Sequence, residues 1–261
     1  MFPRALLDRF DCVGFALLYN AAKINATGGA SVSARVLPLL LHDDSGLTRR
    51  NVTVDHLVVA GWTGRDRAAV ELHIKELGAL GVKPPATTPI FYRASAARLT
   101  IADSIEVLGE ASSGEGEFVL LQQDGRLWVG AGSDHTDREV EKYGVSVSKQ
   151  MCDKPIAPEF WPMVEVAPHW DKLMLRAYIS ENGKRVLYQE GPVTAMLDPL
   201  DLIEKFAGKS GLAEGTLMFG GTLSAKGGVR PSDVFEVELD DPVLGRKIQH
   251  RYGIRTLPVL G

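Results

Sequence analysis

The clearest helical pattern in this sequence follows a short apolar run near residue 60. Val70, Ile74 and Leu77 recur at helical spacing and predict the buried stripe of a helix. We expect the helix to begin at Thr63, a residue type common at helix starts, and to end near Leu80. A glycine and two adjacent prolines follow, which is typical of a helix end.

Short apolar runs with the composition of β-strands fill most of the remaining chain. We expect strands over 52–60, 89–93, 104–108, 115–122, 126–130, 173–180, 184–189, 217–220, 234–239 and 247–255. An alternating stretch over 145–149 predicts one more short strand, and 199–206 predicts a second helix. Because strands and helices do not alternate regularly, the pattern favours an α+β fold over a doubly wound sheet.

One predicted hairpin has a register that can be worked out from the sequence. Asp124-Gly125 is a strong two-residue turn signal between two of the expected strands. If these two residues form the turn, Glu115 lies opposite Asp134 and Glu117 lies opposite Gly132. Three carboxylates then converge at the open end of the hairpin, with small residues beside them.

This carboxylate cluster predicts a site for a divalent cation. Glu115 and Glu117 are two apart on a strand, so their side chains leave the same face and repel each other. A hard cation that takes oxygen ligands resolves the repulsion, and Mg²⁺, Mn²⁺ or Ca²⁺ fit best with Asp134 as third ligand. Two alternatives remain: Asp137 is a rival ligand, and two glutamates at this spacing are common on a solvated strand edge.

Composition and charge narrow the functional classes. The chain has 261 residues, of which 45% are hydrophobic and 24% charged, as in ordinary globular proteins. A formal net charge of −4 leaves no basic surplus to neutralise phosphates, which argues against a nucleic-acid partner. No run approaches the roughly 20 apolar residues of a membrane helix, and the start lacks the order of a secretory signal. We therefore expect a cytoplasmic protein without a membrane partner, in which Cys12 and Cys152 are free thiols.

The beginning of the chain differs from the rest. Residues 26–33 are small and rich in Gly and Ser, which is typical of a linker, and 42–46 form a turn cluster. No residue type there suggests chemistry. We expect residues 1–52 to be an N-terminal extension of unclear structure and residues 53–261 to form a catalytic domain.

Other polar residues are candidates only by their spacing. His73 and Glu76 are three apart on the predicted helix, so they share a face, and a carboxylate beside an imidazole makes a general base. An ordinary surface pair explains the same spacing. Arg138 and Lys149 could bind a carboxylate or an oxyanion, or could instead form an ion pair and a solvent-facing lysine. A Gly-Gly-Thr turn that ends at Thr222 would let the backbone approach a ligand closely.

Several short motifs follow one another in a consistent order along the chain. They are His73-Ile74-Lys75-Glu76, Ile90-Phe91-Tyr92, Glu115-Gly116-Glu117, Asp134-His135-Thr136-Asp137-Arg138, Lys149-Gln150-Met151, Gln189-Glu190-Gly191 and Gly220-Gly221-Thr222. Each motif is weak alone, but the ordered set, over residues 58–259, resembles the fumarylacetoacetate hydrolase superfamily.

The resemblance implies a fold, a metal and a reaction class. The fold is a mixed β-roll or β-sandwich with few short helices, usually in a homodimer. Mg²⁺ (or Mn²⁺ or Ca²⁺) is implied as cofactor, and a small-molecule keto acid as substrate. The implied activity is hydrolysis or lysis of a C–C bond in an acylpyruvate-like or other α-keto acid. Keto-acid decarboxylation, isomerisation or hydration are alternatives, as is a non-catalytic protein that binds metal and keto acid.

The resemblance also assigns roles to particular residues. Glu115, Glu117 and Asp134 are expected to hold the metal. His73 and Glu76 are expected to activate water, and Lys149 to stabilise an oxyanion. The expected substrate-binding residues are Arg138, Gln189, Gly221 and Thr222.

Overall fold

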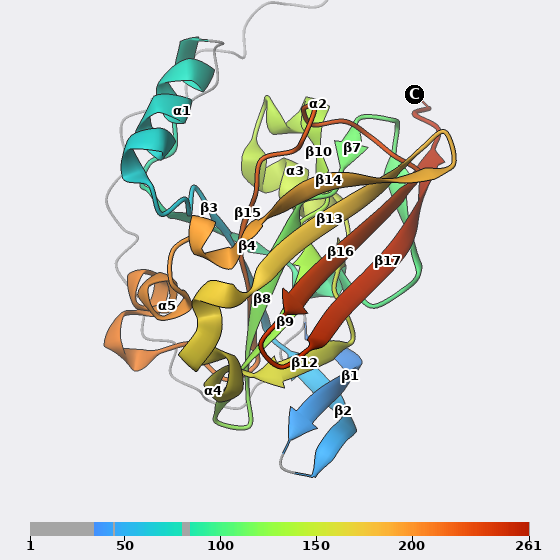
Figure 1. Cartoon of the computed structure of the whole chain (residues 1–261). Coiled ribbons are helices and arrows are strands. Elements are labelled where there is room, and N and C mark those ends of the chain that lie inside the picture. Colours follow the sequence, from blue (N-terminus) through green and yellow to red (C-terminus); the bar gives the residue numbers. More distant parts are fainter. Residues whose placement is uncertain (1–33, 44, 80–83, 261) are drawn as a thin grey trace, which may run out of the picture. The chain divides into compact units, whose positions relative to one another are not determined.

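The computed structural model describes residues 34–43, 45–79 and 84–260 of the chain (Figure 1). Within them, two large β-sheets make up most of the structure, and short helices lie at their ends and edges. The Gly/Ser-rich stretch over 26–33 and Cys12 lie outside the described residues, so the expectations for them stay predictions.

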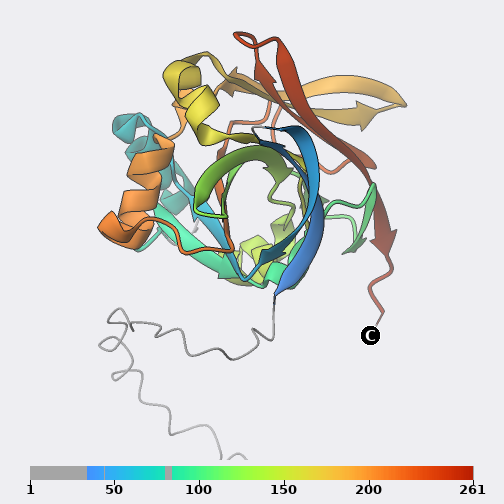
Figure 2. The same cartoon turned by 90° about the horizontal axis from the view of Figure 1, so that it is seen from below.

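The larger sheet has eight strands in the order β2-β1-β12-β9-β8-β15-β3-β4 within the described residues. Seen end-on in Figure 2, this sheet curls strongly around its own interior. Its strands are β1 (Arg35–Asp43), β2 (Gly46–Val54), β3 (His56–Gly61), β4 (Ile90–Ala94), β8 (Gly116–Gln123), β9 (Arg126–Ser133), β12 (Glu159–Pro162) and β15 (Thr216–Thr222).

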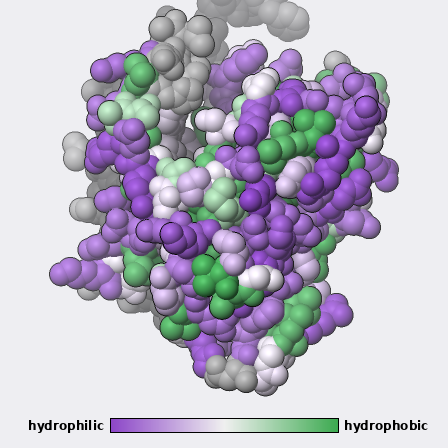
Figure 3. Space-filling view, in the orientation of Figure 1, coloured by the Kyte–Doolittle hydropathy of each residue, from purple (hydrophilic) through white to green (hydrophobic). Residues whose placement is uncertain are grey.

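The second sheet has five strands in the order β14-β13-β16-β17-β6. Its strands are β6 (Ser104–Leu108), β13 (Met174–Glu181), β14 (Lys184–Pro192), β16 (Val234–Asp241) and β17 (Arg246–Leu257). Buried residues alternate with more exposed ones along β13, so one face of this sheet packs on the core. The surface on the side of this sheet is largely hydrophilic (Figure 3).

Short elements complete the described part of the chain. Two small ladders pair β10 (Thr136–Asp137) with β7 (Ser112–Ser113), and β11 (Lys154–Pro155) with β5 (Leu99–Thr100). The α-helices are α1 (Arg67–Ala79), α2 (Arg138–Glu141), α3 (Val145–Met151), α4 (Met163–Val166) and α5 (Pro199–Ala207). None of the described helices is long and apolar enough to cross a membrane.

Strand β8 is buried on both faces and separates two hydrophobic cores. Phe118 and Leu120 belong to the core between the two sheets, whereas Val119 and Leu121 belong to the core inside the curled sheet. Because side chains alternate along a strand, Glu117 leaves β8 on the same face as Val119 and Leu121. The carboxylate therefore lies at the end of the curled sheet's interior.

The predicted hairpin has the expected register. Asp124 and Gly125 both have positive φ, 55° and 69°, as a type I′ turn requires. Glu117 pairs with Gly132, as worked out from the sequence, and the Asp134 amide donates to the Glu115 carbonyl at 3.0 Å. The α+β class with a mixed β-roll and few short helices is confirmed as well.

Two local expectations need correction. Residues 145–149 are not a strand but part of helix α3, because the stretch is too short for its alternation to outweigh packing. Helix α1 begins at Arg67, and Asp66 caps it by accepting from the amides of Ala68 and Ala69 at 3.0 and 3.1 Å. Residues 35–54 contain the paired strands β1 and β2, and the expected division into residues 1–52 and 53–261 stays a prediction.

Candidate metal centre

The open end of the β8–β9 hairpin brings Glu115, Glu117 and Asp134 together. Each offers a carboxylate oxygen, and the three oxygens lie within 4.8 Å of one another. Glu117 is 2% exposed and Asp134 is fully buried, whereas Glu115 is half-buried. Three carboxylates this close in a buried site fit a divalent cation with oxygen ligands.

Glu117 is the carboxylate most in need of a positive partner. Burial raises its pKa well above the ordinary value, and the charges of Asp134 and Glu115 raise it further. The Lys149 charge acts in the opposite direction, as does the Gly221 amide, which donates to Glu117 Oε2 at 2.6 Å. The donor set and its crowding therefore support the predicted cation site.

Gly221 can bring its amide to Glu117 only because it has no side chain. Its φ is +107°, which L side chains rarely adopt. A Cβ on Gly221 would lie 1.8 Å from Thr63 Oγ1, far inside van der Waals contact. The Gly-Gly-Thr turn thus has a steric reason in this fold, and Thr63 packs against it rather than capping helix α1.

Asp134 is clamped between two lysines. Lys149 Nζ contacts Asp134 Oδ2, and Lys154 Nζ lies 3.2 Å from Oδ1. Burial alone would raise the pKa of Asp134, but the two ammonium groups outweigh it and hold the pKa at about 2. Asp134 is therefore ionised at neutral pH.

Lys149 reaches the cluster from the buried face of α3. Its Nζ also lies 3.3 Å from Glu115 Oε2, so one ammonium bridges two of the three carboxylates. Although burial lowers the pKa of Lys149, Asp134 and Glu115 raise it above its ordinary value. The alternative of a solvent-facing lysine is therefore excluded.

Arg138, at the start of α2, holds Glu115 from the other side. Its Nη1 donates to Glu115 Oε1 at 3.0 Å and to Glu141 Oε2 at 2.9 Å, and its Nε donates to Ser113 at 2.7 Å. Asp137, the rival ligand, instead caps α2 by accepting hydrogen bonds from the amides of Glu139 and Val140. Its carboxylate lies outside the group that could hold a metal.

Gln189 and Thr222 hold the strand between the two glutamates. Gln189 Oε1 accepts from the Gly116 amide at 2.9 Å, and the Thr222 hydroxyl donates to the Gly116 carbonyl at 2.9 Å. Gln189 Nε2 donates to Thr222 Oγ1 at 2.8 Å, which closes the arrangement. Both side chains are thus engaged within the protein, and their predicted contact with substrate stays a prediction.

The predicted general base lies beyond what the structure describes. Helix α1 includes positions 73 and 76, but the side chains of His73 and Glu76 are outside the described residues. Their role stays a prediction that depends on the family resemblance.

Sequence reasoning missed a buried polar network behind the cluster. His135 lies between Tyr252 and Ser112, with both ring nitrogens 3.0 Å from a hydroxyl oxygen. Tyr252 donates to Ser133 Oγ at 2.8 Å, and Ser133 Oγ also accepts from the Glu115 amide at 3.2 Å. Burial, helped by the nearby cations, lowers the pKa of His135 to about 3, so the ring is neutral. No spacing in the sequence points to Tyr252, which comes from β17.

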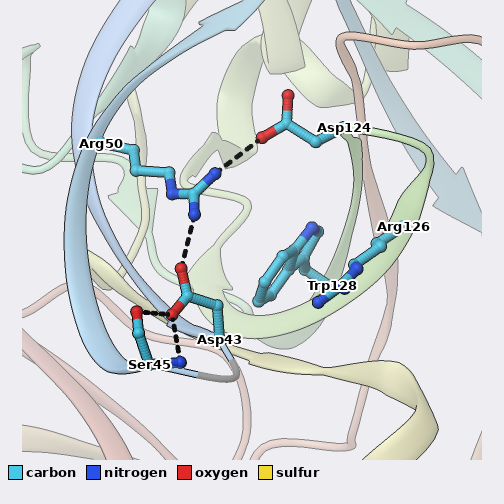
Figure 4. Close-up of a pocket in the computed structure, with 6 residues that line it drawn as sticks. All are labelled: Asp43, Ser45, Arg50, Asp124, Arg126 and Trp128. Carbon is cyan, nitrogen blue, oxygen red and sulfur yellow. Dashed lines mark hydrogen bonds and ion pairs between the residues drawn. The ribbon is translucent and has the colours of Figure 1, made fainter.

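A polar cavity lies at the opposite, turn end of the same hairpin. It has a volume of about 380 Å³ and is drawn in Figure 4. Arg50 spans it, with Nη2 at 2.5 Å from Asp43 and Nη1 at 3.2 Å from Asp124. The cavity is lined by Asp43, Ser45, Arg50, Asp124, Arg126 and Trp128.

Solved structures with a similar fold are fumarylacetoacetate hydrolase family proteins and related enzymes. Yeast ynq8, a fumarylacetoacetate hydrolase family protein, is 18% identical with a TM-score of 0.56, over 79% of this chain and 95% of that one. A 2-keto-3-deoxy-D-arabinonate dehydratase, complexed with magnesium and 2,5-dioxopentanoate, is 13% identical with a TM-score of 0.59, over 84% and 79%. The fold expected from the resemblance is therefore confirmed.

Sequence comparison alone gives a family without an assigned activity. No curated protein matches the chain. The model of the family described as "Protein of unknown function (DUF2848)" matches residues 60–252. Because the match spans most of the sequence, the chain belongs to this family.

Proposed function

We propose that this protein is a divalent-metal-dependent enzyme that hydrolyses a C–C bond in an acylpyruvate-like α-keto acid. The observation that carries the proposal is the group of three carboxylates, Glu115, Glu117 and Asp134, within 4.8 Å at the buried end of the hairpin. Two solved structures of similar fold support it, because one is named as a fumarylacetoacetate hydrolase family protein and the other holds magnesium with a keto compound.

The reaction needs water and a place for negative charge. Water adds to the carbonyl carbon remote from the carboxylate, the adjacent C–C bond breaks, and its electron pair stays on the enolate of the departing keto acid. Glu115, Glu117 and Asp134 would hold a divalent ion, Mg²⁺ or Mn²⁺, whose positive charge would stabilise the negative charge on the departing group. The enolate then takes up a proton, so that the products are a carboxylate and an α-keto acid.

Side chains of the site have complementary tasks in this proposal. Lys149 is held charged beside Glu115 and Asp134, so its ammonium can stabilise an oxyanion next to the metal. Arg138 fixes the orientation of Glu115 through its contact at 3.0 Å. His73, oriented by Glu76, is proposed to take the proton of the attacking water. Mg²⁺ is proposed as the native ion and the homodimer as the working form.

An assay of pyruvate release from acylpyruvates tests the proposal. Activity should disappear after treatment with a chelator and return with Mg²⁺. Glu117→Gln should reduce turnover at least about 100-fold, because the loss of several kcal/mol of charge stabilisation is worth that much. Asp124→Asn, which changes an acid at the other end of the hairpin, is the control and should keep full activity. Full activity of Glu117→Gln, or activity that ignores the chelator, would contradict the proposal.

Dehydration of a 2-keto-3-deoxy sugar acid is a second candidate. It is favoured by one observation, the likeness to the dehydratase whose structure holds magnesium and 2,5-dioxopentanoate. The same site would serve it, since removal of a proton from C3, beside the keto group, gives an enolate, which then expels the C4 hydroxyl as water. A panel with both substrate types separates the two reactions, because only hydrolysis releases pyruvate.

A further inference from the structure

Lys154 is a lysine with no exposed surface beside the candidate metal centre. It lies on the two-residue strand β11, which pairs in parallel with β5. Lysines are almost never fully buried unless their charge is paired. A fully buried ammonium group therefore needs a specific reason at this place.

Three oxygens surround the Lys154 ammonium group. Nζ donates to the carbonyls of His135 at 2.6 Å and Cys152 at 3.2 Å, and it lies 3.2 Å from Asp134 Oδ1. The two carbonyls accept hydrogen bonds from it, whereas the contact with Asp134 Oδ1 is an ion pair, because Oδ1 has no hydrogen-bond partner among the described residues. Lys154 thus links the Asp134 carboxylate to the backbone carbonyls of His135 and Cys152.

The two lysines contact different oxygens of the same carboxylate. Lys149, which also contacts Glu115, lies at Asp134 Oδ2. Oδ2 therefore shares the Lys149 ammonium with Glu115 Oε2, whereas Oδ1 is the oxygen that contacts Lys154. Among the described residues, the ion pair of Lys154 is made with Asp134 alone. Lys154 therefore affects the site through Asp134 and not through an ion pair with either glutamate.

We infer that Lys154 is a positioning residue, which fixes the rotation of Asp134 so that Oδ2 stays directed at the metal. The inference rests on the proposed metal site. By holding the His135 carbonyl, Lys154 also fixes the backbone directly after Asp134. Groups that orient metal ligands from behind contribute strongly to affinity, although they do not contact the ion.

A simple counter-charge is the competing explanation, and it predicts the opposite sign. A cation 3.2 Å from a ligand carboxylate repels a dication, so its removal would tighten metal binding. If Lys154 orients Asp134, its removal frees the carboxylate to turn and weakens binding. The sign of the change in metal affinity therefore separates the two roles.

The experiment is a Mn²⁺ titration of the full chain, with free Mn²⁺ followed by electron paramagnetic resonance. Lys154→Met should raise the Kd about 10- to 100-fold. Arg98→Met is the matched control, because Arg98 pairs with Asp153, the neighbour of Lys154, at 3.5 Å. It removes one charge next to β5, the strand that pairs with β11, and should leave the Kd within about twofold, as expected of a partly exposed pair. An unchanged or lower Kd in Lys154→Met would overturn the inference.

A second variant keeps the test decisive if Lys154→Met does not fold. Lys154→Gln retains a donor in place of the charge, and circular dichroism checks its fold before titration. A Kd raised severalfold supports positioning, whereas equal or tighter binding overturns it. If the wild-type chain itself takes up no Mn²⁺, the metal proposal fails together with this inference. If the wild type binds Mn²⁺ normally and the variants bind it equally well, the inference about Lys154 fails while the metal proposal stands.

Discussion

The two ends of the β8–β9 hairpin carry similar charged residues in opposite environments. At the turn end, Arg50 bridges Asp43 and Asp124, and the side chains of Arg50 and Asp124 are 43% and 51% exposed. At the open end, Glu117 and Asp134 are buried with Glu115 beside them. One sheet thus holds a partly exposed set of carboxylates at the turn end, drawn in Figure 4, and a more deeply buried set at the open end.

Burial decides what each set of charges can do. At the turn end, hydrogen bonds from Ser45, followed by Arg50, lower the pKa of Asp43 to about 2, so its charge is already satisfied. At the open end, burial and neighbouring carboxylates raise the pKa of Glu117 well above its ordinary value. The negative charge of Glu117 is therefore disfavoured unless a further cation compensates it. A cation site is therefore expected there and not at the turn.

Glycines at the two ends should differ most in their tolerance of a side chain. Both Gly221 and Gly125 have positive φ, but a Cβ on Gly221 would lie 1.8 Å from Thr63 Oγ1, whereas one on Gly125 meets nothing within 4 Å. Gly221→Ala should destabilise the fold by about 3–4 kcal/mol through overpacking and backbone strain. Gly125→Ala introduces backbone strain but no clash, so it should lower the free energy of unfolding by about 1 kcal/mol.

Urea unfolding followed by circular dichroism measures both variants. Gly221→Ala should also weaken metal-induced stabilisation, because the Gly221 amide donates to Glu117 at 2.6 Å. Thr63→Ser combined with Gly221→Ala leaves the clashing oxygen in place and should restore little. Equal losses in the two glycine variants would show that crowding at the open end is not the deciding factor.

The hairpin could be predicted from the sequence because its information is local. A two-residue turn fixes the register of the strands that it joins, so Asp124-Gly125 placed Glu117 opposite Gly132. Apolar runs with strand composition likewise predicted most of the longer strands and the α+β class. Helix α3 was missed because tertiary contacts, such as Ser148 Oγ donating to the Asp137 carbonyl at 2.5 Å, decide a seven-residue segment.

The support behind the metal centre could not be predicted, because it comes from distant segments. Tyr252 meets His135 and Ser133 from more than a hundred residues away in the chain. Lys154 is near Asp134 in sequence, but only the pairing of β11 with β5 buries it. Neither residue has a neighbour at a spacing that suggests chemistry. Such contacts depend on the sheet order, which the sequence pattern left open.

Removal of one hydroxyl should test how much the buried network contributes. Tyr252→Phe leaves His135 Nδ1 and Ser133 Oγ without their common partner, so it should destabilise the fold by about 2 kcal/mol. Tyr188→Phe is the matched control. Tyr188 is about equally buried, but within the described part of the chain its hydroxyl accepts a single long hydrogen bond of 3.4 Å, from the Arg230 amide. Its loss should therefore destabilise the fold by about 0.5 kcal/mol. Similar urea midpoints for the two variants would contradict a special role for the network.

The smallest effect is expected at the exposed end, in the pH dependence contributed by Asp43. Its pKa is about 2 in the fold and 3.8 in an unperturbed chain, so its ionised form stabilises the fold above pH 3.8. This contribution shrinks as the pH falls from 3.8 towards 2. At neutral pH, the Tm of the wild type should therefore be slightly higher than that of Asp43→Asn. This difference in Tm, the gap, should close as the pH falls from 3.8 towards 2. Ser45→Ala, which removes the strongest hydrogen bond to Asp43, should reproduce part of the gap. A gap that stays constant down to the lowest pH at which both chains fold would show that the effect of Asp43 is steric rather than electrostatic.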